Sequence, residues 1–161
     1  MLLQNLINSN PKTSNIQTIF RVLLGAMLMF AGTTHLTVAR TEFLAQVPKW
    51  VPLDGDLVVV LSGIAELTLG AALIILRKYK ALTGWIVAAF FVAIFPGNIS
   101  QYVNHVDAFN LNTDTARAVR LLFQPPLVLW ALWSSGAWQA WRSVSSGQST
   151  TDQDPEQRIK V

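Results

Sequence analysis

Residues 56–76 read DLVVVLSGIAELTLGAALIIL, an uninterrupted apolar run whose only internal charge is Glu66. A run of about 20 apolar residues is long enough to cross the hydrocarbon core of a bilayer as a helix. The run does not alternate between apolar and polar residues, which favours a helix over the strand of a membrane barrel. This segment therefore predicts a transmembrane helix with one carboxyl group near its middle.

Three further apolar runs have the same length and character. They cover residues 16–38, 82–104 and 118–141 and hold few charges. In lipid, every backbone polar group must be hydrogen-bonded within the protein, so helices are expected for all four runs. The sequence predicts an all-α fold, an integral membrane four-helix bundle over residues 16–141.

The composition excludes several classes of protein. Of the 161 residues, 52% are hydrophobic and only 13% are charged, against roughly 25% charged in soluble domains. A soluble enzyme, a disordered chain and a nucleic-acid-binding protein are therefore not expected. The chain has no cysteine, which removes disulfides, thiolate nucleophiles and thiolate metal sites, and with only two histidines we expect no bound metal.

Lys and Arg are distributed unevenly between the two sides of the predicted bundle. Eight lie on one side and four on the other. The positive-inside rule then predicts a protein of the cell (inner) membrane with both termini in the cytoplasm. Residues 1–15 are expected to be a cytoplasmic N-terminal segment and residues 142–161 a disordered cytoplasmic tail. Residues 40–55 form a short amphipathic segment, expected to lie at the outer interface and cap the bundle.

Polar residues recur on one face of each run. The face of the first run that holds His35 also holds two glycines, and the same is true of Glu66 in the second run. Because polar groups that face lipid are costly, we expect these faces to meet in an outward-facing polar pocket. Arg21 lies near the inner boundary, and we expect it to extend to the headgroups instead. The expected ligand-binding residues are His35, Glu66, Asn98, Gln101, Arg120 and Gln124.

Most members of this set also have a structural interpretation. Asn98, Gln101 and Gln124 suit interhelical hydrogen bonds or the carbonyl group that Pro96 leaves free, and Arg120 suits a headgroup anchor. Glu66 is the hardest to explain structurally, because a carboxyl group in mid-membrane must be neutral, paired or hydrated.

Five segments of the chain, in order along residues 21–138, resemble the DoxX-like family of small four-helix membrane proteins. They are Phe30-Ala31-Gly32-Thr33-Thr34-His35, Val47-Pro48-Lys49-Trp50-Val51-Pro52, Ser62-Gly63-Ile64-Ala65-Glu66-Leu67-Thr68-Leu69-Gly70, Phe95-Pro96-Gly97-Asn98 and Arg120-Leu121-Leu122-Phe123-Gln124. The family usually has alanine where Gly97 stands, and its fifth motif has an internal proline that is displaced here to Pro125-Pro126. Neither departure removes a polar group.

The resemblance implies a role in membrane redox systems without assigning a reaction. Some relatives are associated with quinone-linked sulfur oxidation, others with methylamine-dehydrogenase maturation or oxidative-stress complexes. We therefore expect an accessory or small-molecule-binding component of a membrane redox system, with quinone as a suitable ligand and with redox-complex subunits and the lipid membrane as partners. The alternative is a non-catalytic assembly subunit whose polar residues only hold the bundle together. No self-contained catalytic motif is present, so the sequence names no catalytic residue.

Overall fold

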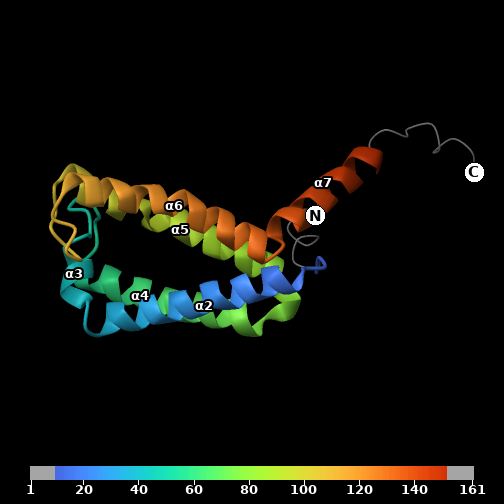
Figure 1. Ribbon diagram of the computed structural model, residues 1–161, viewed down its shortest axis with the longest axis horizontal. Coiled ribbons are helices and arrows are strands. Elements are labelled where there is room, and N and C mark those ends of the chain that lie inside the picture. Colours follow the sequence, from blue (N-terminus) through green and yellow to red (C-terminus); the bar gives the residue numbers. More distant parts are fainter. Residues whose placement is uncertain (1–9, 152–161) are drawn as a thin grey trace, which may run out of the picture.

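The computed structural model describes residues 10–151, and all of its regular structure is helical within that range. The main elements follow one another along the chain (Figure 1). They are α2 (Asn15–Leu36), α3 (Arg40–Leu44), α4 (Gly55–Ile75), the 3-10 turn η1 (Arg77–Tyr79), α5 (Lys80–Val103), α6 (Asp114–Ser134) and α7 (Ala137–Thr151).

Local sequence signals begin the long helices. Ser14 caps α2 in a reciprocal arrangement with Gln17, in which each side chain bonds the other residue's backbone N–H. Asp54 and Thr113 cap α4 and α6 by accepting from backbone N–H groups of the first turn. Between α6 and α7 the chain turns at Gly136, whose φ of 74° favours glycine.

The long helices are arranged as two closely packed pairs, α2 with α4 and α5 with α6 (Figure 1). Glycines bring the first pair together. A Cβ atom built on Gly25 would lie 2.8 Å from the carbonyl oxygen of Gly70, and one built on Gly32 would lie 2.6 Å from that of Gly63. The early residue of one helix thus meets the late residue of the other, so α2 and α4 are antiparallel and touch through their backbones.

The molecule has two ends of different construction. We call the end that holds α3 and the connection between α5 and α6 the α3 end, and the end that holds η1 and the start of α2 the η1 end (Figure 1). The main hydrophobic core lies toward the η1 end, where its residues come from both pairs of helices. It is made of Leu24, Leu28, Leu73, Val87, Ala88, Phe91, Ala131, Leu132 and Ala137.

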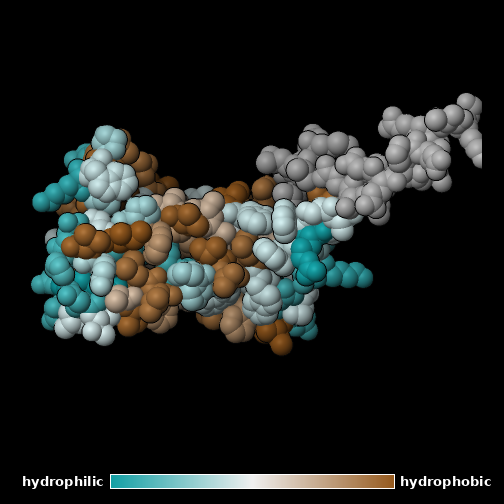
Figure 2. All heavy atoms as spheres, turned by 90° about the horizontal axis from the view of Figure 1, so that it is seen from above, coloured by the Kyte–Doolittle hydropathy of each residue, from teal (hydrophilic) through white to brown (hydrophobic). Residues whose placement is uncertain are grey.

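Three helical segments are long and apolar enough to cross a membrane, namely Asn15–Leu36, Gly55–Ile75 and Arg77–Val103. Large apolar side chains also face outward, and Phe30 and Leu122 are 73% and 72% exposed. On the face that Figure 2 shows, the most hydrophilic side chains lie near the two ends and mainly hydrophobic or neutral ones lie between them. Such a surface is consistent with a membrane protein.

Three of the expected runs coincide with α2, α4 and α5 to within two residues at each end. The fourth expected run, 118–141, differs, because Gly136 divides it between α6 and α7. Helix α7 continues to Thr151 and so covers the first part of the tail expected to be disordered. Residues 152–161 of that tail and residues 1–9 of the N-terminal segment lie outside the described residues.

Candidate functional site

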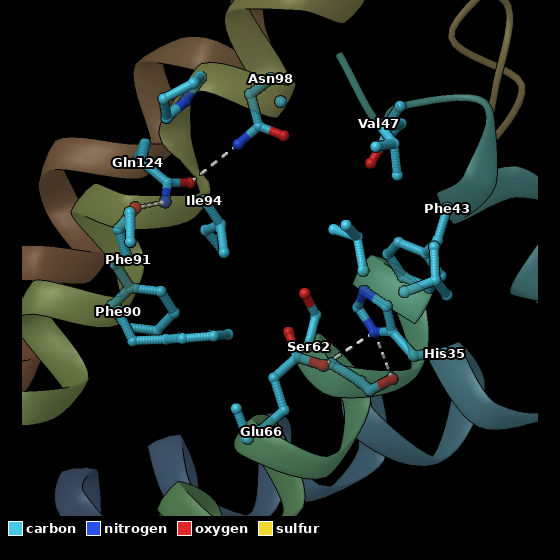
Figure 3. A pocket seen from close by; sticks show the side chains of 18 of the residues that line it. His35, Phe43, Val47, Ser62, Glu66, Phe90, Phe91, Ile94, Asn98 and Gln124 are labelled. Carbon is cyan, nitrogen blue, oxygen red and sulfur yellow. Dashed lines mark hydrogen bonds and ion pairs between the residues drawn. The ribbon is translucent and has the colours of Figure 1, made fainter. Parts of the chain in front are cut away.

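A cavity of about 690 Å³ lies between the two helix pairs toward the α3 end. Its walls come from α2 and α4 on one side and from α5 and α6 on the other (Figure 3). Residues from α3 and the segment that follows it, including Phe43, Val47 and Trp50, complete the lining. Most of the lining is aliphatic or aromatic, and a few polar side chains project into it.

His35 and Glu66 meet on the wall formed by α2 and α4 (Figure 3). Nδ1 of His35 lies 2.8 Å from Oε2 of Glu66 and 3.0 Å from the carbonyl oxygen of Ala31. A carbonyl oxygen only accepts, so a hydrogen bond to Ala31 requires a hydrogen on Nδ1. Oε2 of Glu66 is buried beside the imidazole without a hydrogen-bond donor. Glu66 therefore retains an unused acceptor in a largely apolar site.

Asn98 and Arg120 are hydrogen-bonded on the opposite wall. Nε of Arg120 donates to Oδ1 of Asn98 at 3.3 Å, and Nη2 donates to Oε1 of Gln46 at 3.1 Å. Nδ2 of Asn98 donates to Oε1 of Gln124 at 3.1 Å. None of the ion pairs in the described part of the chain includes Arg120, so this wall presents a cation held by neutral amides.

Gln124 and Gln101 tie this network to the backbone. Nε2 of Gln124 donates to the carbonyl oxygen of Phe91 at 2.5 Å (Figure 3). That carbonyl lies next to the one that loses its N–H partner because Pro96 has none. Oε1 of Gln101 accepts from Nε2 of Gln46 at 2.7 Å. The two amides thus fix the polar wall to the helices behind it.

Stacked side chains connect the two walls at the α3 end. The imidazole of His35 stacks on the ring of Phe43, with centroids 3.2 Å apart, and Phe43 meets Phe109 edge to face at 4.6 Å. The guanidinium carbon of Arg120 lies 4.8 Å from the centroid of Phe109. Phe109 has a φ of 56°, which a bulky residue rarely adopts. This chain of contacts closes the α3 end of the cavity.

Two groups of ion-paired side chains flank the same end. Arg40 donates twice to Asp56, and these hydrogen bonds raise the pKa of Arg40 above its usual value. Asp114 is held by His105 at 2.8 Å and by Arg117 at 2.7 Å. The hydrogen bond with His105, followed by that with Arg117, lowers the pKa of Asp114. Both groups link the segments at this end to the long helices.

The structure brings five of the six expected residues to the cavity and leaves one behind its wall. His35, Glu66, Asn98, Arg120 and Gln124 line the cavity. Gln101 is only 1% exposed and does not line it. Its Nε2 donates to the carbonyl oxygens of Val106 and Ala108, so it holds the α5–α6 connection in place behind the cavity wall.

Sequence reasoning missed several lining residues. Gln46 is buried and bonds Arg120, yet it lies in a segment expected only to cap the bundle. The sequence feature that could have indicated Gln46 is that it is a single amide residue between apolar residues of that segment. Ser62 lines the cavity four residues before Glu66 and so lies on the same helical face. Phe43 gave no sequence signal for its contact with His35.

Arg21 does not extend toward headgroups as expected. Its side chain packs inside the helices and the residue is only 3% exposed. It shares the inward face of α2 with Gly25 and Gly32, and the close approach of α4 to these glycines leaves Arg21 on the buried side.

Over residues 10–151 the fold is all-helical, and three of its helices are apolar enough to cross a membrane. The model of a domain of unknown function, DUF8561, matches residues 24–135, so the chain belongs to this family. The matched range includes all six expected site residues and excludes Arg21. No curated protein and no solved structure matches the chain.

Proposed function

We propose that this chain is a four-span, DoxX-like protein of the cell membrane that binds an amphipathic small molecule, of which a quinone or quinol is the best-suited class. One observation supports this most directly. The carboxyl group of Glu66 has a buried oxygen without a hydrogen-bond donor, and Glu66 lines a cavity of about 690 Å³, a size typical of small-molecule sites. A ligand with a hydroxyl group would supply the missing hydrogen bond.

The two polar walls suit the two oxygens of a quinol. One hydroxyl would donate to Glu66, and the other oxygen would accept from Arg120 or Asn98 across the cavity. The ring would lie among apolar side chains such as Phe90, Phe91 and Ile94. Glu66 and His35 are in contact, so a proton released from the ligand has an acceptor within the site.

Helix α6 is proposed as the fourth span. Its early turns carry Arg117 and Arg120, which lowers its apolar character, but Leu122, Phe123 and Leu129 are 72%, 62% and 66% exposed. Such side chains favour a lipid-facing surface. The distribution of Lys and Arg supports cytoplasmic termini, and redox-complex subunits remain the proposed partners.

Quinone content of the purified protein tests the ligand. The full chain is purified in mild detergent, and quinone extracted with solvent is quantified per mole of protein for wild type, Glu66→Gln and Thr68→Val. Thr68 is an exposed residue of α4 that bonds its own helix, so it is the matched control. We expect Glu66→Gln to lose quinone by about tenfold, since a hydrogen bond to a charged group contributes roughly 1.5–3 kcal/mol.

Thr68→Val should retain the wild-type amount. Absence of quinone from the wild-type protein, or equal amounts in all three proteins, would contradict the proposed ligand. A thermal unfolding curve of Glu66→Gln in the same detergent separates loss of the ligand from loss of the fold.

A second candidate function is that of an assembly subunit without a ligand. It is favoured by the hydrogen bonds of Asn98, Gln101 and Gln124, all of which are made within the protein. In that case Glu66→Gln should lower the unfolding temperature without changing the quinone content.

A further inference from the structure

Arg21 is a buried cation without a partner among residues 10–151. It lies six residues into α2, is 3% exposed, and its Nε and Nη1 atoms have no hydrogen-bond acceptor. None of the ion pairs found within residues 10–151 includes it. A buried charge without a partner is strongly unfavourable, so this guanidinium requires an anion.

The groups around Arg21 are cations too. Arg77 of η1 and Lys80 of α5 lie close enough to interact with its charge. Nζ of Lys80 donates to Oγ1 of Thr13 at 3.0 Å, which brings Lys80 against the start of α2. Gln17, one turn before Arg21, donates to the carbonyl oxygen of Trp133 at 2.7 Å and brings the end of α6 to the same place.

No carboxylate in the described residues can neutralise this cluster. All six Asp and Glu residues between 10 and 151 lie at the α3 end or near the middle of α4. They are Glu42, Asp54, Asp56, Glu66, Asp107 and Asp114. The positive charge at the η1 end must therefore be balanced from outside residues 10–151.

Further donors at this end lack acceptors. Nε1 of Trp85 and Oγ of Ser134 are buried without hydrogen-bond partners. Trp85 follows Lys80 by five residues in α5, and Ser134 follows Trp133 at the end of α6. In the part of the chain that the structure describes, five buried side-chain atoms lack hydrogen-bond partners. Four belong to Arg21, Trp85 and Ser134, and the fifth is Oε2 of Glu66.

We propose that the η1 end is a phosphate-binding site in which Arg21 and Lys80, with Arg77 at the rim, bind the phosphate of a membrane-lipid headgroup or a free phosphate ion. The guanidinium of Arg21 brings N–H donors that lack acceptors within the described residues, and the ammonium of Lys80 adds a point charge. In the four-span arrangement this site lies on the cytoplasmic side, where basic pockets between helices bind anionic lipids. It does not depend on which ligand occupies the cavity at the α3 end.

The unfolding temperature of the full-length protein in detergent tests the site. Sodium phosphate is compared with sodium chloride at equal ionic strength, and phosphatidylglycerol with diacylglycerol, which lacks the phosphate. We expect saturating phosphatidylglycerol to raise the unfolding temperature of the wild-type protein by about 3 °C. A rise with sodium phosphate as well assigns the site to phosphate in general, and a rise with the lipid alone assigns it to the headgroup.

The variants are Arg21→Met, Lys80→Gln and the matched control Arg142→Gln. Arg142 is an exposed residue of α7 that takes part in none of the ion pairs described above. Arg21→Met should abolish the rise, Lys80→Gln should reduce it, and Arg142→Gln should leave it unchanged. Without phosphate, Arg21→Met should be at least as stable as wild type, because it removes an unpaired buried charge.

Three outcomes would overturn the site. The first is a wild-type unfolding temperature that neither phosphate nor phosphatidylglycerol changes. The second is an equal loss of the response in Arg142→Gln and Arg21→Met, which would mean that only the total charge matters. The third concerns a variant that ends at Thr151. If this variant has a lower unfolding temperature than wild type, and phosphate does not change the unfolding temperature of wild type, the anion would be assigned to carboxylates of residues 152–161.

Discussion

Arg120 at the α3 end donates to two side-chain oxygens and stacks on an aromatic ring, whereas Arg21 at the η1 end is more deeply buried and has two donor atoms without acceptors. Both arginines lie on inward faces of long helices. The difference arises from their neighbours. Asn98 and Gln46 surround Arg120 with neutral oxygens, while Arg77 and Lys80 surround Arg21 with positive charge.

This comparison shows that burial alone does not tell how well a charge is accommodated. At the α3 end the cation is already hydrogen-bonded, and the group that lacks a hydrogen-bond donor is the carboxyl oxygen of Glu66 beside His35. At the η1 end the groups that lack partners are mainly donors. A ligand at the α3 end should therefore bring a hydrogen-bond donor, and a ligand at the η1 end should bring an anion.

Glycine contacts between α2 and α4 give the largest expected effect. In Gly32→Ala the new methyl group would meet the backbone of Gly63, and we expect a loss of about 1–3 kcal/mol in the free energy of unfolding. Gly25→Ala should lower the free energy of unfolding by a similar amount, because its methyl group would meet Gly70, nearer the η1 end. Only Gly32→Ala should also lower the quinone content, because Gly32 lies one helical turn from His35.

Gly97→Ala is the control for these variants. Its new Cβ would meet only the carbonyl oxygen of Gln46, at 3.5 Å, which is an ordinary contact. Equal stability of Gly32→Ala and Gly97→Ala in chemical unfolding would show that the backbone contact between α2 and α4 is not tight.

Replacing each arginine by methionine tests the comparison directly. Arg120→Met leaves Oδ1 of Asn98 and Oε1 of Gln46 without this donor, and we expect it to cost about 1–3 kcal/mol of unfolding free energy. Arg21→Met should cost nothing in phosphate-free buffer. Unfolding of the two variants in the same detergent gives both values, and an equal loss in both would remove the distinction between the two ends.

The hydrogen bond between Gln46 and Gln101 gives a smaller effect at the α3 end. A double-mutant cycle with Gln46→Leu and Gln101→Leu should yield a coupling free energy of about 0.5–1.5 kcal/mol. Gln101→Leu alone should cost more than Gln46→Leu, because Gln101 also donates to two backbone carbonyls. A coupling near zero would mean that the two amides do not act together.

Asp114 gives the smallest effect, which depends on pH. Its lowered pKa means that the fold favours the ionised carboxylate, held by His105 and Arg117. This contribution is present above the usual pKa of about 3.9 and is lost as pH falls through the lowered value in the folded protein. Amide exchange of residues 104–113, relative to intrinsic rates, should accelerate over that range.

Asp114→Asn should remove this pH dependence. Amides of η1 serve as the internal control, because the η1 end has no carboxylate within the described residues. A similar acceleration at both ends would indicate general acid unfolding instead of a local ion pair.

The periodicity of the apolar runs predicted most of the fold. The ends of α2, α4 and α5 follow directly from where the apolar residues begin and end, and the common faces of His35 and Glu66 follow from 100° per residue. The division of the last run at Gly136 was not predicted. A glycine beside apolar residues can continue a helix or end it, and only its backbone φ angle shows which.

The sequence by itself determined that the chain is helical and rich in apolar surface. It also determined that the polar residues of each apolar run lie on one face of its helix. Periodicity is a local property, so it could place Glu66, Asn98 and Arg120 on inward faces. Only the tertiary structure decided that His35 contacts Glu66, that Gln46 completes the network of Arg120, and that Arg21 is buried among other cations. These contacts depend on how α2, α3 and the η1 turn meet distant helices, and no pattern within a single segment specifies that meeting.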